Sequence, residues 1–126
     1  MYTDLLTKIR NAQAAKRETL KVSFSNPDFA VAELLAAKGY LASAAKKGRM
    51  PKRIIEIGLR YADGKGAIQG VRFLSRPSLR RYGGYREFRL VRQGYGLAVV
   101  STSKGIMTAG EARKQKVGGQ LLFEIW

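Results

Sequence analysis

The segment from Arg76 to Arg92 concentrates the side chains best suited to bind phosphate. It contains six arginines and one acidic residue, Glu87, with aromatic residues interleaved. The arginines are Arg76, Arg80, Arg81, Arg86, Arg89 and Arg92, and the aromatic residues are Tyr82, Tyr85 and Phe88. A guanidinium binds phosphate oxygens in pairs, and guanidinium and phenol groups both stack on bases. The segment therefore predicts contact with RNA, against the alternative of a solvated basic loop over a few core aromatics.

A second group of reactive side chains is the run Ser101-Thr102-Ser103-Lys104-Gly105, which follows an apolar stretch typical of a buried strand. Short hydroxyls can bind a base edge, a 2′-hydroxyl or a phosphate where longer side chains would clash. Gly105 lets the backbone turn tightly or approach a ligand closely. The alternative is a turn whose hydroxyls bind their own backbone, and composition alone does not separate the two.

Catalytic chemistry finds little support in the sequence, which has no cysteine and no histidine. Ser101 and Ser103 have Lys104 as a conceivable base, but adjacent strand residues point to opposite faces, so a hydrolase ranks last. The nine carboxylates are scattered without the spacing of a metal site or an acid–base pair. We therefore expect no enzyme, no cofactor and no small-molecule substrate.

The charge balance points to a polyanionic partner. Lys and Arg total 24 against 9 Asp and Glu, a formal net charge of +15, and a domain this basic repels itself unless a polyanion neutralises it. A membrane surface is the alternative to nucleic acid, but the apolar face of the first helix is needed for the core. The apolar runs are too short to span a bilayer and no signal peptide is recognisable, so we expect a cytoplasmic protein that binds no membrane.

The first half of the chain predicts the order helix, strand, helix, strand, strand. The expected helices are 3–16 and 28–38, and the expected strands are 20–24, 40–45 and 53–61. Thr3 would cap the first helix, Pro27 suits the start of the second and Gly39 its end. A turn at 62–66 would then return the chain as a partner strand, 67–75.

The second half predicts mostly strand with one short helix. A buried strand is expected at 97–100, a helix at 108–114 with Thr108 and Glu111 as a capping box, and a last strand at 120–126. Gly118-Gly119 suggests a turn that needs positive φ. We therefore predict an α+β fold of two small lobes, a helix–strand–helix–strand–strand lobe at 1–66 and a mostly β, RNA-binding lobe at 67–126.

Several stretches, in matching order along nearly the whole chain, resemble the bacterial small-subunit ribosomal protein eight family. They are Leu6–Ala12, Lys38–Tyr40, Ser75–Arg80, Ser101–Thr108, Glu111–Arg113 and Gly118–Gly119. The Ser-Thr-Ser-x-Gly block with its downstream Gly-Gly is the most specific. The resemblance implies a two-lobed α+β protein that binds the central domain of 16S ribosomal RNA and helps to organise the platform of the small subunit. It also implies ribosomal proteins five and twelve as neighbours and, in some bacteria, repression of translation of its own operon.

The resemblance also assigns residues by position, as three groups of RNA contacts. The loop Ser101, Thr102, Ser103, Lys104 and Gly105 would read RNA; Arg76, Pro77, Arg80 and Tyr82 would lie beside the same RNA helix; and Asp4, Arg10 and Asn11 would face a second RNA surface. The sequence departs from the family pattern at Ser78, where Gly is usual, and in 83–94, which has arginines in place of an acidic residue followed by Pro. Arginines and lysines would supply most of the affinity and the hydroxyl loop the specificity. A protein that binds any duplex by charge alone is the main rival.

Overall fold

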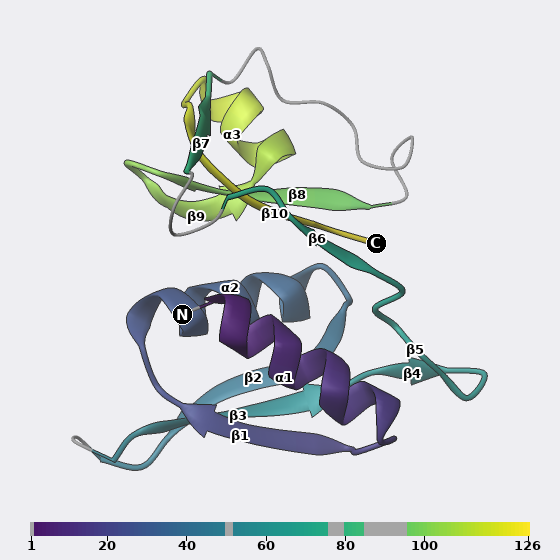
Figure 1. Cartoon of the computed structure of the whole chain (residues 1–126). Helices are drawn as coiled ribbons and strands as arrows, with labels where there is room; N and C mark the ends of the chain where they lie inside the picture. Colours follow the sequence, from purple (N-terminus) through teal and green to yellow (C-terminus); the bar gives the residue numbers. More distant parts are fainter. Residues whose placement is uncertain (1, 50–51, 76–79, 85–95) are drawn as a thin grey trace. The chain divides into compact units, whose positions relative to one another are not determined.

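The computed structural model describes residues 2–49, 52–75, 80–84 and 96–126. The chain divides into two compact units, Met1–Ala67 and Ile68–Trp126, which we call the first and the second unit. Each combines helix with antiparallel strands (Figure 1), so the predicted α+β class is confirmed.

The first unit places two helices against one face of a three-stranded antiparallel sheet (Figure 1). The strand order is β1-β3-β2, and a separate two-stranded ribbon, β4-β5, follows. The elements are α1 (Tyr2–Ala14), β1 (Thr19–Ser23), α2 (Asn26–Ala37), β2 (Leu41–Lys47), β3 (Ile54–Leu59), β4 (Tyr61–Ala62) and β5 (Lys65–Gly66). The predicted order of helix, strand, helix, strand, strand is confirmed.

The helix starts differ slightly from those that the sequence predicted. Helix α1 begins at Tyr2, so Thr3 lies inside its first turn instead of capping it. Helix α2 begins after Ser25, whose side chain accepts the Asp28 N–H at 3.3 Å, and Pro27 lies in its first turn as predicted. Gly39 has a φ of +88° and follows the C-terminal residue Lys38, which agrees with its predicted place at the helix end.

The core of the first unit lies between the helices and the inner face of the sheet. Along β3, buried residues alternate with half-buried ones, as a strand with one covered face requires. The buried apolar side chains of this unit are Leu5, Leu6, Ile9, Ala12, Val22, Val31, Ala32, Leu35, Leu41, Ile55, Ile57 and Leu59.

The predicted turn at 62–66 is confirmed, but its predicted partner strand is wrong. Asp63 and Gly64 have φ values of +53° and +75°, which is the geometry of a tight hairpin turn. This turn joins β4 to β5, and the ribbon that they form extends no further than Gly66. Only residues 71–73 of the expected strand form one, β6 (Val71–Phe73), and it pairs with the last strand of the chain. The physical reason is that β3 already has β1 on one edge and β2 on the other, so no edge is free.

The second unit is organised around its last strand in chain order. Its elements are β6, β7 (Arg81–Gly83), β8 (Leu97–Thr102), β9 (Gly105–Thr108), α3 (Ala109–Gln115) and β10 (Gly119–Ile125). Strand β10 pairs with β8, and also with both β6 and β7, while β9 pairs with the far edge of β8. Every one of these pairings is antiparallel.

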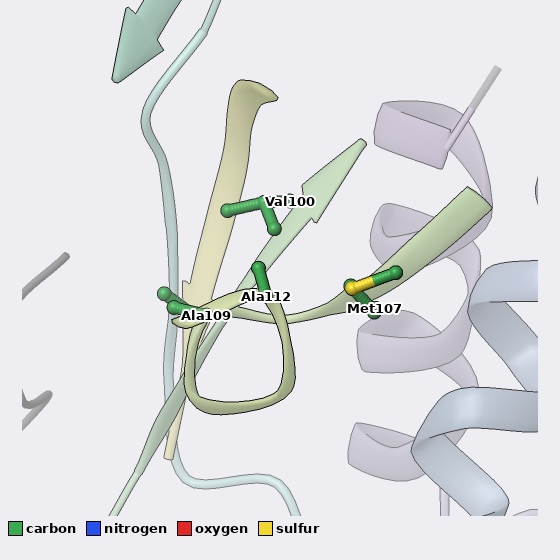
Figure 2. Packing of buried hydrophobic residues seen from close by; sticks show 5 residues of the cluster. Val100, Met107, Ala109 and Ala112 are labelled. Carbon is green, nitrogen blue, oxygen red and sulfur yellow. The ribbon is translucent and has the colours of Figure 1, made fainter. Parts of the chain in front are cut away.

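Helix α3 closes a small core over this sheet. Val100, Met107, Ala109 and Ala112 belong to one buried cluster (Figure 2), and Trp126 packs against it. The predicted N-cap, Thr108, is confirmed, and its side chain also contacts that of Glu111. The Thr108 hydroxyl accepts the Glu111 N–H at 3.1 Å and lies 3.2 Å from the Glu111 Oε1.

The Gly118-Gly119 pair serves a different purpose from the predicted one. Neither residue has positive φ. Instead, a Cβ on Gly118 would lie 2.6 Å from the carbonyl oxygen of Gly83, and a Cβ on Gly119 would overlap the carbonyl oxygen of Ser101. Both positions need glycine because β10 passes close to the backbones of β7 and β8, not because of a left-handed turn.

Candidate nucleic-acid interface

The hydroxyl run of the sequence forms the tip of the β8–β9 hairpin. Ser101 and Thr102 end β8, Ser103 and Lys104 make the turn, and Gly105 begins β9. The pairing brings Ser101 opposite Ile106 and Thr102 opposite Gly105. Ser103, Lys104 and Gly105 are exposed, so the predicted loop is accessible to a ligand.

Thr102 stabilises this turn from inside. Its hydroxyl accepts the backbone N–H of Lys104 at 3.1 Å and donates to the carbonyl oxygen of Gly105 at 2.8 Å. The self-capping alternative weighed from sequence therefore holds for Thr102. Among the described residues, the hydroxyls of Ser101 and Ser103 have no such partner, so they remain available to an external group.

Gly105 needs to be glycine for its backbone conformation. Its φ is +112°, a region that side chains rarely adopt, and no described atom lies within 4 Å of the place where a Cβ would stand. The space over this residue is therefore open. A ligand can approach the backbone there without meeting a side chain.

Tyr82 and Ser101 lie in one row across the sheet, on either side of Gln120. Tyr82 is opposite Gln120 in the β7–β10 pair, and Ser101 is opposite Gln120 in the β10–β8 pair. Directly paired residues share a face, and two strand spacings separate Tyr82 from Ser101 by about 10 Å. Tyr82 is 67% exposed, the highest value for a large apolar side chain in the described part of the chain. Tyr82, which belongs to the described part of the arginine-rich stretch, and Ser101, the first residue of the hydroxyl run, thus lie on one face of the sheet.

Ser75 is hydrogen-bonded to the first residue of β7 and to β10. Its buried hydroxyl accepts the Arg81 N–H at 2.9 Å and donates to the carbonyl oxygen of Leu121 in β10. Arg76 and Pro77, predicted as RNA contacts, lie outside the described residues. Arg80 directly precedes β7 and is exposed.

The remaining predicted contacts belong to the first unit. Asp4, Arg10 and Asn11 are all exposed on α1, outside the face formed by its buried residues. Asp4 and Asn11 are separated by seven residues, about two helical turns, so they lie along one stripe of the helix. These three residues make a surface of their own unit, which we treat separately from the hairpin.

Gln120 and Ser75 are the residues of this surface that the sequence did not single out. Gln120 joins the row because of strand register, which no local pattern reveals. The only feature of the sequence that could have drawn attention to Ser75 is its position directly before the arginine-rich segment. Within the described ranges, no group of three metal-ligating side chains occurs and no helix is long and apolar enough to cross a membrane.

The fold and this surface define a small, strongly basic α+β protein that presents hydroxyl, amide and phenol groups in one row across a sheet. Comparison with known proteins shows which family this chain belongs to. The family model described as Ribosomal protein S8 matches residues 1–126. The chain therefore belongs to the ribosomal protein S8 family, whose members are structural components of the ribosome and not enzymes.

Curated relatives agree over nearly the whole chain. A small ribosomal subunit protein uS8 of Mycoplasma mobile is 36% identical over 123 residues, covering 98% of this chain and 92% of that protein. The uS8 of Acinetobacter baumannii is 41% identical over 119 residues, covering 94% and 91%. The uS8 of Persephonella marina is 41% identical over 131 residues, covering 98% and 95%. The resemblance seen in the sequence is confirmed.

Proposed function

We propose that this protein is a structural component of the small ribosomal subunit that binds the central domain of 16S ribosomal RNA and helps to assemble the platform. The names of its relatives support a place in the small ribosomal subunit. The net charge of +15 supports a polyanionic partner. The protein would act in the cytoplasm, as part of the ribosome.

The row Tyr82–Gln120–Ser101 is the observation that carries the proposal. It combines a ring that can stack, an amide that can donate and accept, and a small hydroxyl, all on one sheet face. Ser103 and Gly105 extend the same hairpin into solvent. Such groups fit the shallow minor groove of RNA, where 2′-hydroxyls and base edges are displayed.

Charge and hydroxyl groups would divide the work of recognition. Exposed cations such as Arg80 and Lys104 neutralise phosphates and supply affinity that depends on salt but not on sequence. The hydroxyl groups of Ser101 and Ser103 supply discrimination, because a buried RNA polar group left without its partner is costly. Asp4, Arg10 and Asn11 would meet a second surface of the RNA from the first unit.

Two finer elements of the proposal come from the family resemblance. Ribosomal proteins five and twelve would be neighbours in the assembled subunit. The protein would also repress translation of its own operon by binding a messenger RNA site that imitates the ribosomal one, because a surface that recognises shape accepts any RNA with that shape.

The test is crosslinking in cells followed by sequencing of the attached RNA. Most crosslinks should fall in the central domain of 16S ribosomal RNA, with a second group in the operon message if the repression holds. Crosslinks spread evenly over cellular RNA would instead favour the rival that binds by charge alone. In vitro, competition by duplex DNA should be weak for the proposed function and strong for that rival.

A further inference from the structure

One end of the first unit's sheet carries a dense group of cations that the proposed site does not use. Residues 46–53 contain five basic residues and no acidic one. We call these five residues the basic tip: Lys46, Lys47, Arg49, Lys52 and Arg53. Arg53 is half-buried and the others are exposed. Because like charges repel, such a cluster requires counter-charges within the protein or a polyanion outside it.

The backbone gathers these cations at one place. The β2–β3 ladder ends with Lys47 opposite Ile54, and the Lys52 N–H donates to the carbonyl oxygen of Arg49 at 2.9 Å beyond it. The Phe24 N–H donates to the carbonyl oxygen of Arg53 at 3.1 Å, which joins the end of β1 to the same edge.

The protein neutralises little of this charge. Lys47 Nζ lies 2.7 Å from Glu56 Oε2. The hydrogen bond from Lys47, followed by the positive charges of Lys47 and Lys21, holds the pKa of the Glu56 carboxyl below its usual value. Within the described part of the chain, the other four cations of the tip have no carboxylate at ion-pair distance.

Two aromatic rings hold part of the tip in place without cancelling its charge. The rings of Phe24 and Phe29 lie 5.9 Å apart. Lys46 Nζ is 5.1 Å from the centre of the Phe29 ring, and the Arg53 guanidinium is 5.5 Å from that of Phe24. The negative face of a ring attracts a cation and leaves its net charge unchanged. Lys46 and Arg53 are therefore held in place before any ligand arrives, which lowers the entropic cost of binding.

We propose that the basic tip is a further RNA contact, which binds backbone phosphates through Lys46, Arg49, Lys52 and Arg53. The inference rests on the proposed function only in naming RNA as the polyanion. Phe24 and Phe29 are half-buried, so they offer no open stacking platform. The exposed large apolar residues of the described chain, Phe73 and Tyr82, belong to the second unit, so the described residues around the tip include no exposed large apolar side chain of the kind that insertion into a membrane needs. Contact through phosphates alone adds affinity and no sequence discrimination.

The test compares two double variants with the same change in charge and composition. Arg49→Gln with Lys52→Gln removes one Arg and one Lys from the tip. Arg17→Gln with Lys65→Gln removes the same pair from exposed positions elsewhere in the first unit. Binding is measured against salt concentration, with a transcribed 16S central-domain RNA and with an unrelated RNA duplex. Thermal unfolding checks that all proteins are folded.

The tip variant should lower the slope of log affinity against log salt by about two on both RNAs, while the control changes it by less than about half a unit. Equal slopes for the two variants would overturn the inference, as would tip-dependent binding to anionic phosphatidylserine vesicles in place of RNA. The proposed function fails separately, if the unmodified protein binds both RNAs equally well. In that case the slope change still decides whether the tip binds RNA.

Discussion

The buried hydroxyl of Ser75 accepts a hydrogen bond from the backbone N–H of Arg81 at 2.9 Å. It also donates to the carbonyl oxygen of Leu121 in the central strand β10. One side chain thus joins residue 75 to the start of β7 and to β10. Arg80, a predicted RNA contact, directly precedes β7, so its position depends on a residue that need not touch RNA.

Replacing Ser75 with alanine should lower the free energy of unfolding by about 1–3 kcal/mol, because two part-buried hydrogen bonds to the backbone of Arg81 and Leu121 are lost. Urea unfolding measures this loss. Ser103→Ala serves as the control, since its exposed hydroxyl binds no described residue and its stability should stay within about 0.5 kcal/mol of the unmodified protein. If both variants were equally stable, Ser75 would not anchor the start of β7.

Ser101→Ala and Ser103→Ala should each weaken binding to the central-domain RNA by about 1–2 kcal/mol and leave binding to unrelated RNA unchanged. Filter binding or calorimetry on both RNAs measures the difference. Arg80→Ala should behave in the opposite way, with affinity lost on both RNAs and a salt slope lower by about one. Equal losses on the two RNAs for the serine variants would reject the proposed division of work.

Gly119→Ala should destabilise the second unit by about 1–3 kcal/mol, because the added methyl group overlaps the carbonyl oxygen of Ser101 and must push β8 away from β10. Thermal unfolding followed by circular dichroism measures the change. Gly84→Ala is the matched control, since no described atom lies within 4 Å of its Cβ position and its φ is not left-handed. Similar effects at the two positions would contradict the close approach of the strands.

Lys116→Gly should stabilise the protein by about 0.5–1 kcal/mol, because Lys116 ends α3 with a φ of +57°, where glycine avoids the strain of a side chain. Lys114→Gly provides the contrast. It lies inside the same helix, where glycine should cost about 0.5–1 kcal/mol. Changes of the same sign in the two variants, measured by urea unfolding, would show that backbone strain at Lys116 is negligible.

The sequence predicted best what short segments decide by themselves. The Thr108 cap of α3 and the tight turn at Asp63 and Gly64 depend on residues within one turn of chain, and both were confirmed. The burial of α1 on one face followed from its helical spacing. The α+β class followed in turn from the sum of these elements.

Strand partners could not be predicted in the same way. The sequence predicted that β6 pairs with the strand before the hairpin, but its partner is β10. The paired residues Phe73 and Phe123 are fifty positions apart in the chain. The row of Tyr82 and Ser101 likewise depends on register across β10. The need for glycine at Gly119 arises from the backbone of another strand. Such relationships exist only after distant segments have paired, so no local pattern carries them.

The central place of β10 has a consequence for how the protein is made. Strands β6, β7 and β8 all pair with β10, which follows them in the chain. On a translating ribosome, β6 and β7 emerge early and have no partner until β10 has also emerged. The first unit, whose sheet is complete by Leu59, can fold meanwhile. The surface with Tyr82 and Ser101 is therefore among the last parts of the molecule to form, and the protein cannot hold its RNA through that surface before its synthesis has passed β10.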